Sequence, residues 1–290
     1  MTSLLELGRE ISELAEQIGP SVVGIGNRWR GGSGVVIAEN RVLTNAHNLR
    51  GEDVTVTFAG GRTADATALG VDADGDLAVL EVETGDARPL DAAGTAVSIG
   101  SPVIALGNPG GRGARVTLGF VSGVDRSFRG PRGRRVAGAI EHTAPLLPGS
   151  SGGPVVDMHG SLVGINTNRI GHGFYQAIPA DATLADRIAA LGRGEEPKRR
   201  HLGVGLAPAH VARRLRRAVG LPERDGLLVR EVEDGSPAAT AGIAEGDLIV
   251  AAGAQSVASA DDLFDALAGE GPIQLTLVRG VEELSLTVTP

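Results

Sequence analysis

A serine set among glycines lies near the middle of the chain, in LLPGSSGGPVV at residues 146–156. A serine hydroxyl becomes an effective nucleophile when a base takes its proton, and flanking glycines let backbone N–H groups turn towards a reacting carbonyl. Gly-Ser runs are also common in ordinary turns. Ser151 is therefore a candidate nucleophile only if a base, and an acid that orients the base, occur elsewhere in the chain.

Histidine is the usual partner of a serine nucleophile because its pKa is near neutrality. His47 directly follows the apolar run RVLTNA, where small residues suit a strand end that faces a cleft. His142 lies close to Ser151 in sequence and is a weaker rival. The remaining histidines fall in a polar turn, in a glycine-rich loop or beyond a linker: His159, His172, His201 and His210.

The base needs a carboxylate that fixes its tautomer and stabilises the imidazolium. Asp72, Asp74 and Asp76 cluster just before the apolar run LAVLEV. Asp76 abuts that run, so it is the most easily buried of the three. The resulting order along the chain is histidine, aspartate, serine, which is the order in the chymotrypsin fold.

Composition limits the classes of function. The chain has 290 residues, 42% of them hydrophobic, which is enough for about two domains with real cores. A net charge of −8 argues against a nucleic-acid partner, and the lack of cysteine excludes a disulfide, a thiolate nucleophile and a cysteine zinc site. Neither a phosphate-binding glycine loop nor a metal-ligand cluster occurs, so we expect no cofactor and no metal.

The N-terminal residues do not resemble a signal peptide, because four glutamates interrupt any apolar segment. No run of about 18 apolar residues exists, so we expect no membrane span. The sequence as written therefore predicts a cytoplasmic protein, unless a leader was removed before residue 1.

The hydrophobic pattern divides the chain into four parts. Residues 1–20 predict an amphipathic helix, and residues 21–191 hold ten or more short strand-like runs closed by a helix, which indicates all-β barrels. Residues 192–200 are charged, contain Gly and Pro, and predict a linker. Residues 201–290 mix strands with two helices, one placing Val211, Leu215 and Val219 on a single face and one beginning at Ser259 and stopping at Gly269.

Five blocks stand in a fixed order: VLTNAH, DLAVLEV, ALGNPGG with VTLGFVSGV, GSSGGPVVD and LVGINT. In this order they resemble the HtrA (Deg) family of trypsin-like serine proteases, and the resemblance covers residues 18–290. It implies a mainly β fold, a chymotrypsin-like double β-barrel followed by an α+β PDZ domain. It also implies that Ser151 is the nucleophile, His47 the general base and Asp76 its orienter, with the Gly149 and Ser151 amides forming the oxyanion hole.

The resemblance also implies a pocket that selects the substrate side chain. We expect Leu146, Leu147 and the strand residues Gly164, Ile165 and Asn166 to form its walls. These residues are apolar or small, and no acid is placed to attract lysine or arginine. We therefore predict cleavage after small aliphatic residues such as Val, Ala or Leu.

The trailing segment resembles a PDZ domain, which binds an extended peptide end as an added strand. HLGVGL at 201–206 resembles its carboxylate loop, so Leu202, Gly203 and Val204 would supply amides and an apolar pocket. Leu263 and Phe264 are candidates for the helical side of the groove. A place in the hydrophobic core is an equally good interpretation of Phe264.

Together these observations predict a serine endopeptidase of HtrA type that acts in protein quality control and hydrolyses unfolded or damaged polypeptides. The expected partners are unfolded chains and peptide C-termini. The resemblance further implies a homotrimer and an exported or envelope location. The alternative is a non-catalytic peptide-binding scaffold or chaperone whose protease barrel is vestigial.

Overall fold

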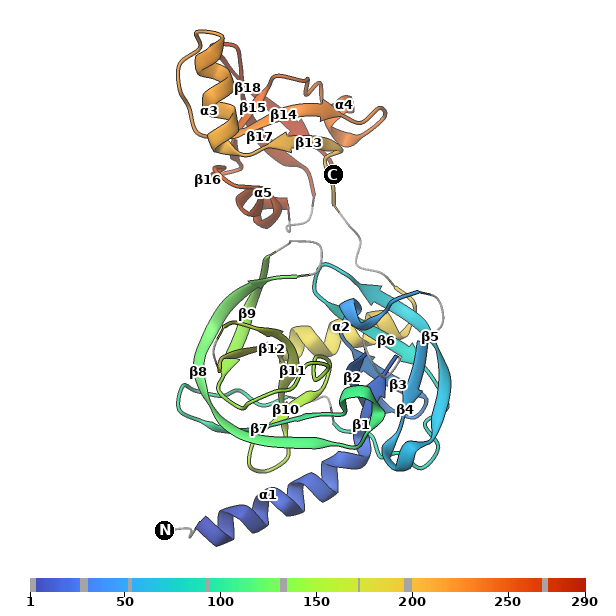
Figure 1. Cartoon of the computed structure of the whole chain (residues 1–290). Helices are drawn as coiled ribbons and strands as arrows, with labels where there is room; N and C mark the ends of the chain where they lie inside the picture. Colours follow the sequence, from blue (N-terminus) through green and yellow to red (C-terminus); the bar gives the residue numbers. More distant parts are fainter. Residues whose placement is uncertain are drawn as a thin grey trace. The chain divides into compact units, whose positions relative to one another are not determined.

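The computed structural model describes residues 4–26, 31–51, 54–91, 94–130, 135–171, 173–195, 200–267 and 271–290. The chain divides into two compact units, Met1–Pro197 and Lys198–Pro290. Figure 1 shows the barrels of the first unit and the smaller sheet of the second. In the described residues, no helix has both the length and the apolar character needed to cross a membrane.

The first unit begins with helix α1 (Leu4–Ile18), which leads into the barrels through the 3₁₀ turn Gly19–Ser21. Its C-terminal turn is anchored, since Leu14 and Ile18 pack against Val22 and the strand residues Ile104 and Leu106. At the other end Leu4 and Leu5 are exposed. Pro20 at the start of the 3₁₀ turn lacks an N–H, which suits the end of the helix.

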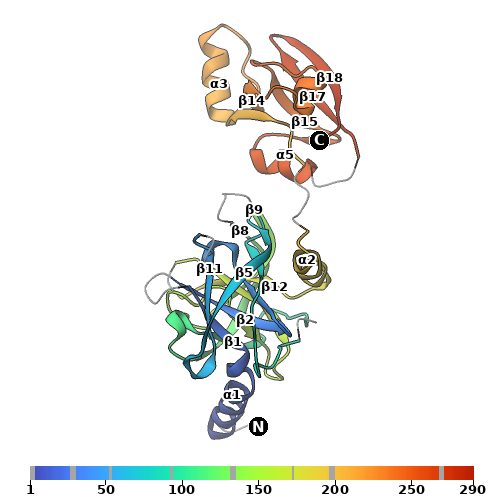
Figure 2. The same ribbon diagram turned by 90° about the vertical axis from the view of Figure 1, so that its right-hand side faces the viewer.

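Two closed antiparallel barrels form the body of this unit (Figure 2). The first has the strand order β1-β2-β3-β6-β5-β4. Its strands are β1 (Val22–Ile25), β2 (Gly32–Ala38), β3 (Arg41–Thr44), β4 (Val54–Thr57), β5 (Thr63–Asp72) and β6 (Leu77–Glu81). The short runs of alternating Val, Ile and Leu fill its interior, and closure leaves no free sheet edge.

The second barrel has the order β10-β11-β12-β9-β8-β7. Its strands are β7 (Pro102–Gly107), β8 (Arg115–Arg129), β9 (Arg135–His142), β10 (Pro154–Val156), β11 (Leu162–Arg169) and β12 (Tyr175–Pro179). Helix α2 (Ala182–Gly192) follows, capped by Asp181, which accepts a hydrogen bond from Leu184 N. Leu184 and Leu191 of α2 join a core that both barrels share, so the helix helps to hold the two barrels together.

The second unit is a small sheet with the order β13-β14-β15-β17-β18, in which β16 pairs with β15. The strands are β13 (Val204–Ala207), β14 (Leu227–Val232), β15 (Leu248–Ala252), β16 (Gln255–Ser256), β17 (Ile273–Arg279) and β18 (Glu282–Val288). The helices are α3 (Ala209–Ala218), α4 (Pro237–Thr240) and α5 (Ala260–Leu267). Because β13 is an edge strand, it can accept another strand. The predicted double barrel and α+β domain are confirmed.

The structure differs from the sequence prediction in one detail of α3 and agrees with it in one detail of α5. The prediction that Val219 belongs to the apolar face of α3 was wrong: the helix ends at Ala218 and Val219 is 72% exposed. Gly220 follows with a φ of +75°, a left-handed conformation that ends helices. Ser259 caps α5 as expected, since its Oγ accepts a hydrogen bond from Asp262 N. Gly269, the predicted stop, lies outside the described residues.

Candidate active site

His47 and Asp76 are brought together by two paired strands of the first barrel. Strand β3 ends beside the start of β6, with Thr44 opposite Ala78. The short 3₁₀ turn Ala46–Asn48 after β3 carries His47, and Asp76 immediately precedes β6. His47 Nδ1 lies 2.9 Å from each carboxylate oxygen of Asp76. Since an ionised carboxylate only accepts, Nδ1 carries the proton and Nε2 is left with a lone pair.

The Asp76 carboxylate is buried, and both of its oxygens accept hydrogen bonds. Its side chain is 2% exposed, whereas that of His47 is 34% exposed. The backbone N–H of His47 donates to Asp76 Oδ1 at 3.1 Å, and Thr167 Oγ1 of β11 donates to Oδ2 at 2.6 Å. Asp76 has a φ of +57°, a left-handed conformation that aspartate tolerates better than most residues. The carboxylate is thus aimed at the imidazole by its own turn and by both barrels.

Ser151 belongs to the loop before β10 of the second barrel. Its Oγ donates a hydrogen bond to the backbone oxygen of Thr167 at 2.9 Å. Across the residues that the structure describes, no hydrogen bond joins this hydroxyl to His47. Thr167 therefore contacts both candidate residues, through its carbonyl to Ser151 and through its hydroxyl to Asp76. Transfer of the Ser151 proton to His47 requires a rotation about the Cα–Cβ bond of Ser151.

The loop at Gly149–Ser151 is tied to the first barrel. Ser33 Oγ of β2 donates to Gly149 O at 2.8 Å and accepts from Asn108 N at 2.8 Å. Ser33 N and Asn48 Nδ2 both donate to Ser151 O, at 2.8 and 2.9 Å. In the described part of the chain, neither Gly149 N nor Ser151 N donates to a protein acceptor. Two fixed and unused N–H groups beside a serine can bind an oxyanion.

Gly152 is required by close backbone approach. It has a φ of +91°, and a Cβ there would lie 2.0 Å from Ser33 O and 2.7 Å from Thr44 Oγ1. Its N–H donates to Asn166 O at 2.7 Å. The loop around Ser151 therefore fits between the two barrels because position 152 is a glycine.

A pocket of about 200 Å³ adjoins Ser151. Of the residues predicted for its walls, Leu146, Leu147 and Asn166 line it, and Gly164 and Ile165 do not. Gly164 lies in mid-sheet between β10 and β12, and Ile165 is fully buried in the shared core. The walls continue instead through Thr167, Asn168 and Arg169 at the end of β11, with Tyr175 on β12. The lining includes no carboxylate.

His142, the rival base, supports this pocket from behind. It is fully buried, its Nε2 lies 3.0 Å from Asn166 Oδ1, and its ring stacks on Tyr175. Burial lowers its pKa from 6.5 to about 4, and the hydrogen bond with Asn166 opposes that effect. His142 is thus a neutral structural group that holds Asn166 in the pocket wall. His172 lies outside the described residues.

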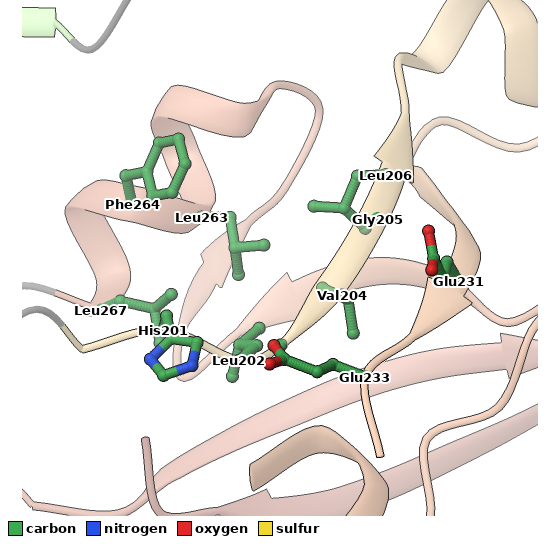
Figure 3. A pocket seen from close by; sticks show the side chains of 11 residues that line it. His201, Leu202, Val204, Gly205, Leu206, Glu231, Glu233, Leu263, Phe264 and Leu267 are labelled. Carbon is green, nitrogen blue, oxygen red and sulfur yellow. The ribbon is translucent and has the colours of Figure 1, made fainter. Parts of the chain in front are cut away.

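The second unit has a groove of about 430 Å³ between β13 and α5 (Figure 3). All five residues predicted for peptide binding line it: Leu202, Gly203, Val204, Leu263 and Phe264. Leu202 and Leu263 are nearly buried, whereas Phe264 is 38% exposed at the rim. Gly203 has a φ of +73°, which shapes the loop before β13. The groove also takes in His201, Glu231 and Glu233, which were not predicted.

Several residues of the site were missed in the sequence. Thr167, Ser33 and Asn48 make hydrogen bonds to site residues that lie 91, 116 and 103 positions away in the sequence. The sequence indicates a place near the pocket for Thr167, because Thr167 adjoins Asn166 in the LVGINT block. Nothing in the sequence around Ser33 or Asn48 indicated that these residues contact the site.

Two closed barrels that meet at a serine, followed by a small sheet with an open edge, define a trypsin-like protease carrying a PDZ domain. A trypsin-like peptidase domain model matches residues 32–165, and a PDZ domain model matches residues 228–279. The HhoA protein of Synechocystis sp. is 38% identical over 89% of this chain and 69% of its own length. Bovine mitochondrial serine protease HTRA2 is 32% identical over 97% of this chain and 67% of its own length.

Two solved protease structures are similar to this chain over nearly its whole length. The serine endoprotease from Yersinia pestis has a TM-score of 0.70 at 27% identity, and 96% of each chain is covered. The HtrA-type protease AlgW with tripeptide has a TM-score of 0.68 at 27% identity, again with 96% of each chain covered. The chain belongs to the HtrA family of serine proteases. It spans about two thirds of the length of the curated relatives named above.

Proposed function

We propose that this protein is an endopeptidase that hydrolyses unfolded or damaged polypeptides through Ser151, His47 and Asp76, with the PDZ domain binding peptide C-termini. The observation that carries this proposal is the buried Asp76 carboxylate, which holds Nδ1 of the partly exposed His47 side chain at 2.9 Å. A carboxylate in this position fixes the tautomer that a general base requires.

In the first half of the reaction, Ser151 turns its hydroxyl from Thr167 O to His47 Nε2. Nε2 takes the proton while Oγ attacks the peptide carbonyl carbon, and the Gly149 and Ser151 amides bind the oxyanion. Asp76 stabilises the imidazolium. Collapse of the tetrahedral intermediate breaks the C–N bond, Nε2–H protonates the leaving amine, and the acyl group stays on Ser151 Oγ.

In the second half, His47 Nε2 takes a proton from water, and the resulting hydroxide attacks the acyl carbonyl carbon. The same two amides bind the new oxyanion. Collapse breaks the bond to Ser151 Oγ, which regains its proton from His47 and releases a free carboxylic acid. No cofactor is needed, because every proton passes between serine, histidine, water and substrate.

A fluorophosphonate probe tests the catalytic half of the proposal. We expect it to label wild-type protein and the Ser12→Ala control on α1, and to leave Ser151→Ala unlabelled. Casein cleavage should follow the same pattern. A wild-type protein that takes no label and cleaves no unfolded substrate would favour the alternative, a peptide-binding scaffold with an inactive barrel.

The PDZ half rests on the edge position of β13 and the apolar groove beside it. An extended peptide can add to that edge with its terminal carboxylate near the amides of Leu202–Val204. A related HtrA-type protease, AlgW, was solved with a tripeptide and with a decapeptide. Titration of Ser151→Ala full-length protein with a labelled peptide, as free acid and as C-terminal amide, tests this. Equal affinity for both forms would overturn binding through the C-terminus.

A further inference from the structure

Two glutamates, Glu231 and Glu233, lie next to β13, the strand at the open edge of the peptide groove. Gly205 of β13 pairs with Glu231 of β14. A Cβ on Gly205 would lie 3.2 Å from Glu231 Cβ and 3.6 Å from its Oε2, and a Cβ on Gly203 would lie 3.3 Å from Glu233 Oε2. Gly205 on β13 and Gly203 just before it carry no side chain, so neither residue covers the neighbouring carboxylate, although Ser236 also packs closely against Gly203. Figure 3 shows Glu231 beside Gly205 and Glu233 reaching towards Leu202.

Strand geometry places these carboxylates on one face and the apolar residues on the other. Side chains alternate along a strand, so Glu231 points away from the face that Val232 occupies, and the carboxylate of Glu233, which directly follows β14, lies near Gly203. Val204 and Leu206, together with Val232 between the glutamates, pack instead against the core that includes Leu263 and Leu267. The groove therefore has an apolar side below β13 and an acidic side above it.

The acidic side has no cation of its own within the described residues. Glu231 and Glu233 are exposed and make no side-chain ion pair or hydrogen bond there. No lysine or arginine lines the groove, and the guanidinium of Arg200 is held at the end of α5 by the carbonyls of Leu267 and Gly271. Lys198 and Arg199 lie outside the described residues.

An added peptide strand must follow the same alternation. Its last side chain enters the apolar side, against Leu263 and Leu267, so the penultimate side chain points to the opposite face beside Gly205. Adjacent strands are about 4.8 Å apart, so the bare glycine lets a long side chain reach across β13 to Glu231. A cation there would also offset the repulsion between Glu233 and the peptide carboxylate.

We propose that the PDZ groove selects C-terminal peptides with an apolar last residue and lysine or arginine in the penultimate position, through Glu231 and Glu233. This inference rests on the proposed binding of peptide C-termini. It narrows the partner class to proteins whose chain ends carry a positive charge next to an apolar terminus.

Fluorescence anisotropy with full-length Ser151→Ala protein tests the selection. Three peptides that end in valine and differ only in the penultimate residue, Lys, Ala or Glu, are titrated at low and high salt. We expect the Lys peptide to bind about tenfold tighter than the Glu peptide, with the Ala peptide between them, because exposed pairs contribute modestly and two carboxylates act together. Salt should reduce the difference.

The double substitution Glu231→Gln and Glu233→Gln should remove the preference, so that the Lys, Ala and Glu peptides bind this variant within about twofold of one another. Glu245→Gln, an exposed glutamate outside the groove, should keep the preference. Equal binding of all three peptides, or a preference that survives the double substitution, would overturn the charge selection but leave the proposed binding of peptide C-termini intact. Failure of every peptide to bind would overturn the proposed peptide-binding function, and the selection with it.

Discussion

Thr167 Oγ1 of the second barrel donates a 2.6 Å hydrogen bond to Asp76 Oδ2 of the first. The same residue accepts the Ser151 hydroxyl at its backbone oxygen. One residue thus makes hydrogen bonds with Asp76 on one barrel and with the Ser151 hydroxyl on the other. The alignment of the candidate triad therefore depends on the contact between the barrels as well as on the three side chains.

Thr167→Val removes the hydroxyl and keeps the shape and the backbone carbonyl. We expect kcat on a peptide substrate to fall about 10- to 100-fold with little change in KM, because a hydrogen bond to a charged group contributes about 1.5–3 kcal/mol. Thr167→Ser should restore most of the rate. Steady-state kinetics of the three proteins decide the matter, and a kcat for the valine variant within twofold of wild type would rule out this positioning role.

Ser33→Ala tests the hydrogen bonds that join β2 to the Gly149–Ser151 loop. Loss of its hydroxyl leaves Gly149 O without its donor in a partly buried setting and Asn108 N without its acceptor in a buried one. We expect unfolding free energy to drop by about 1–3 kcal/mol and kcat to fall about tenfold. Denaturant unfolding and active-site titration separate the two effects. Normal turnover per active site in this variant would contradict a role of Ser33 in holding the loop.

Much of this arrangement was predictable, and the missing parts share a physical cause. The short strand-like runs of residues 21–191 predicted all-β barrels, and the five ordered blocks that resemble the HtrA family predicted that there are two of them. The pocket wall was placed two residues too early on β11, because the sequence does not show where that strand passes from mid-sheet to the rim. Thr167 and Ser33 act across the junction of two barrels, which no local pattern encodes. The predicted domain boundaries and site roles stay predictions.

Gly152→Ala should be far more harmful than an alanine at another glycine with positive φ. Gly171 has a φ of +74° with open space around it, whereas a Cβ on Gly152 would meet Ser33 O at 2.0 Å. We expect about 1 kcal/mol of destabilisation for Gly171→Ala, from backbone conformation alone. Gly152→Ala should lose activity and at least about 3 kcal/mol. Similar melting temperatures for the two variants would contradict the packing of this loop.

His142 should make stability depend on pH below neutrality. Burial lowers its pKa from 6.5 to about 4, so between these values the unfolded chain binds the proton and the folded chain does not. The neutral form therefore contributes stability that is complete above pH 6.5 and is lost as pH falls towards 4. The contribution is about 3 kcal/mol. Unfolding free energy at pH 7 and pH 4.5 should fall less in His142→Gln than in wild type; equal losses would show that His142 is not responsible.

The pocket beside Ser151 should favour small aliphatic side chains before the cleaved bond. The lining of this pocket of about 200 Å³ includes Leu146, Leu147 and Tyr175, and Arg169 belongs to the same lining. A lysine or arginine entering it would meet no carboxylate and would lie near a like charge, whereas Val or Ala would bury apolar surface. A set of peptides differing only at this position should give kcat/KM values for Val, Ala and Leu at least tenfold above those for Lys and Arg. Faster cleavage after Lys or Arg would refute this account of the pocket.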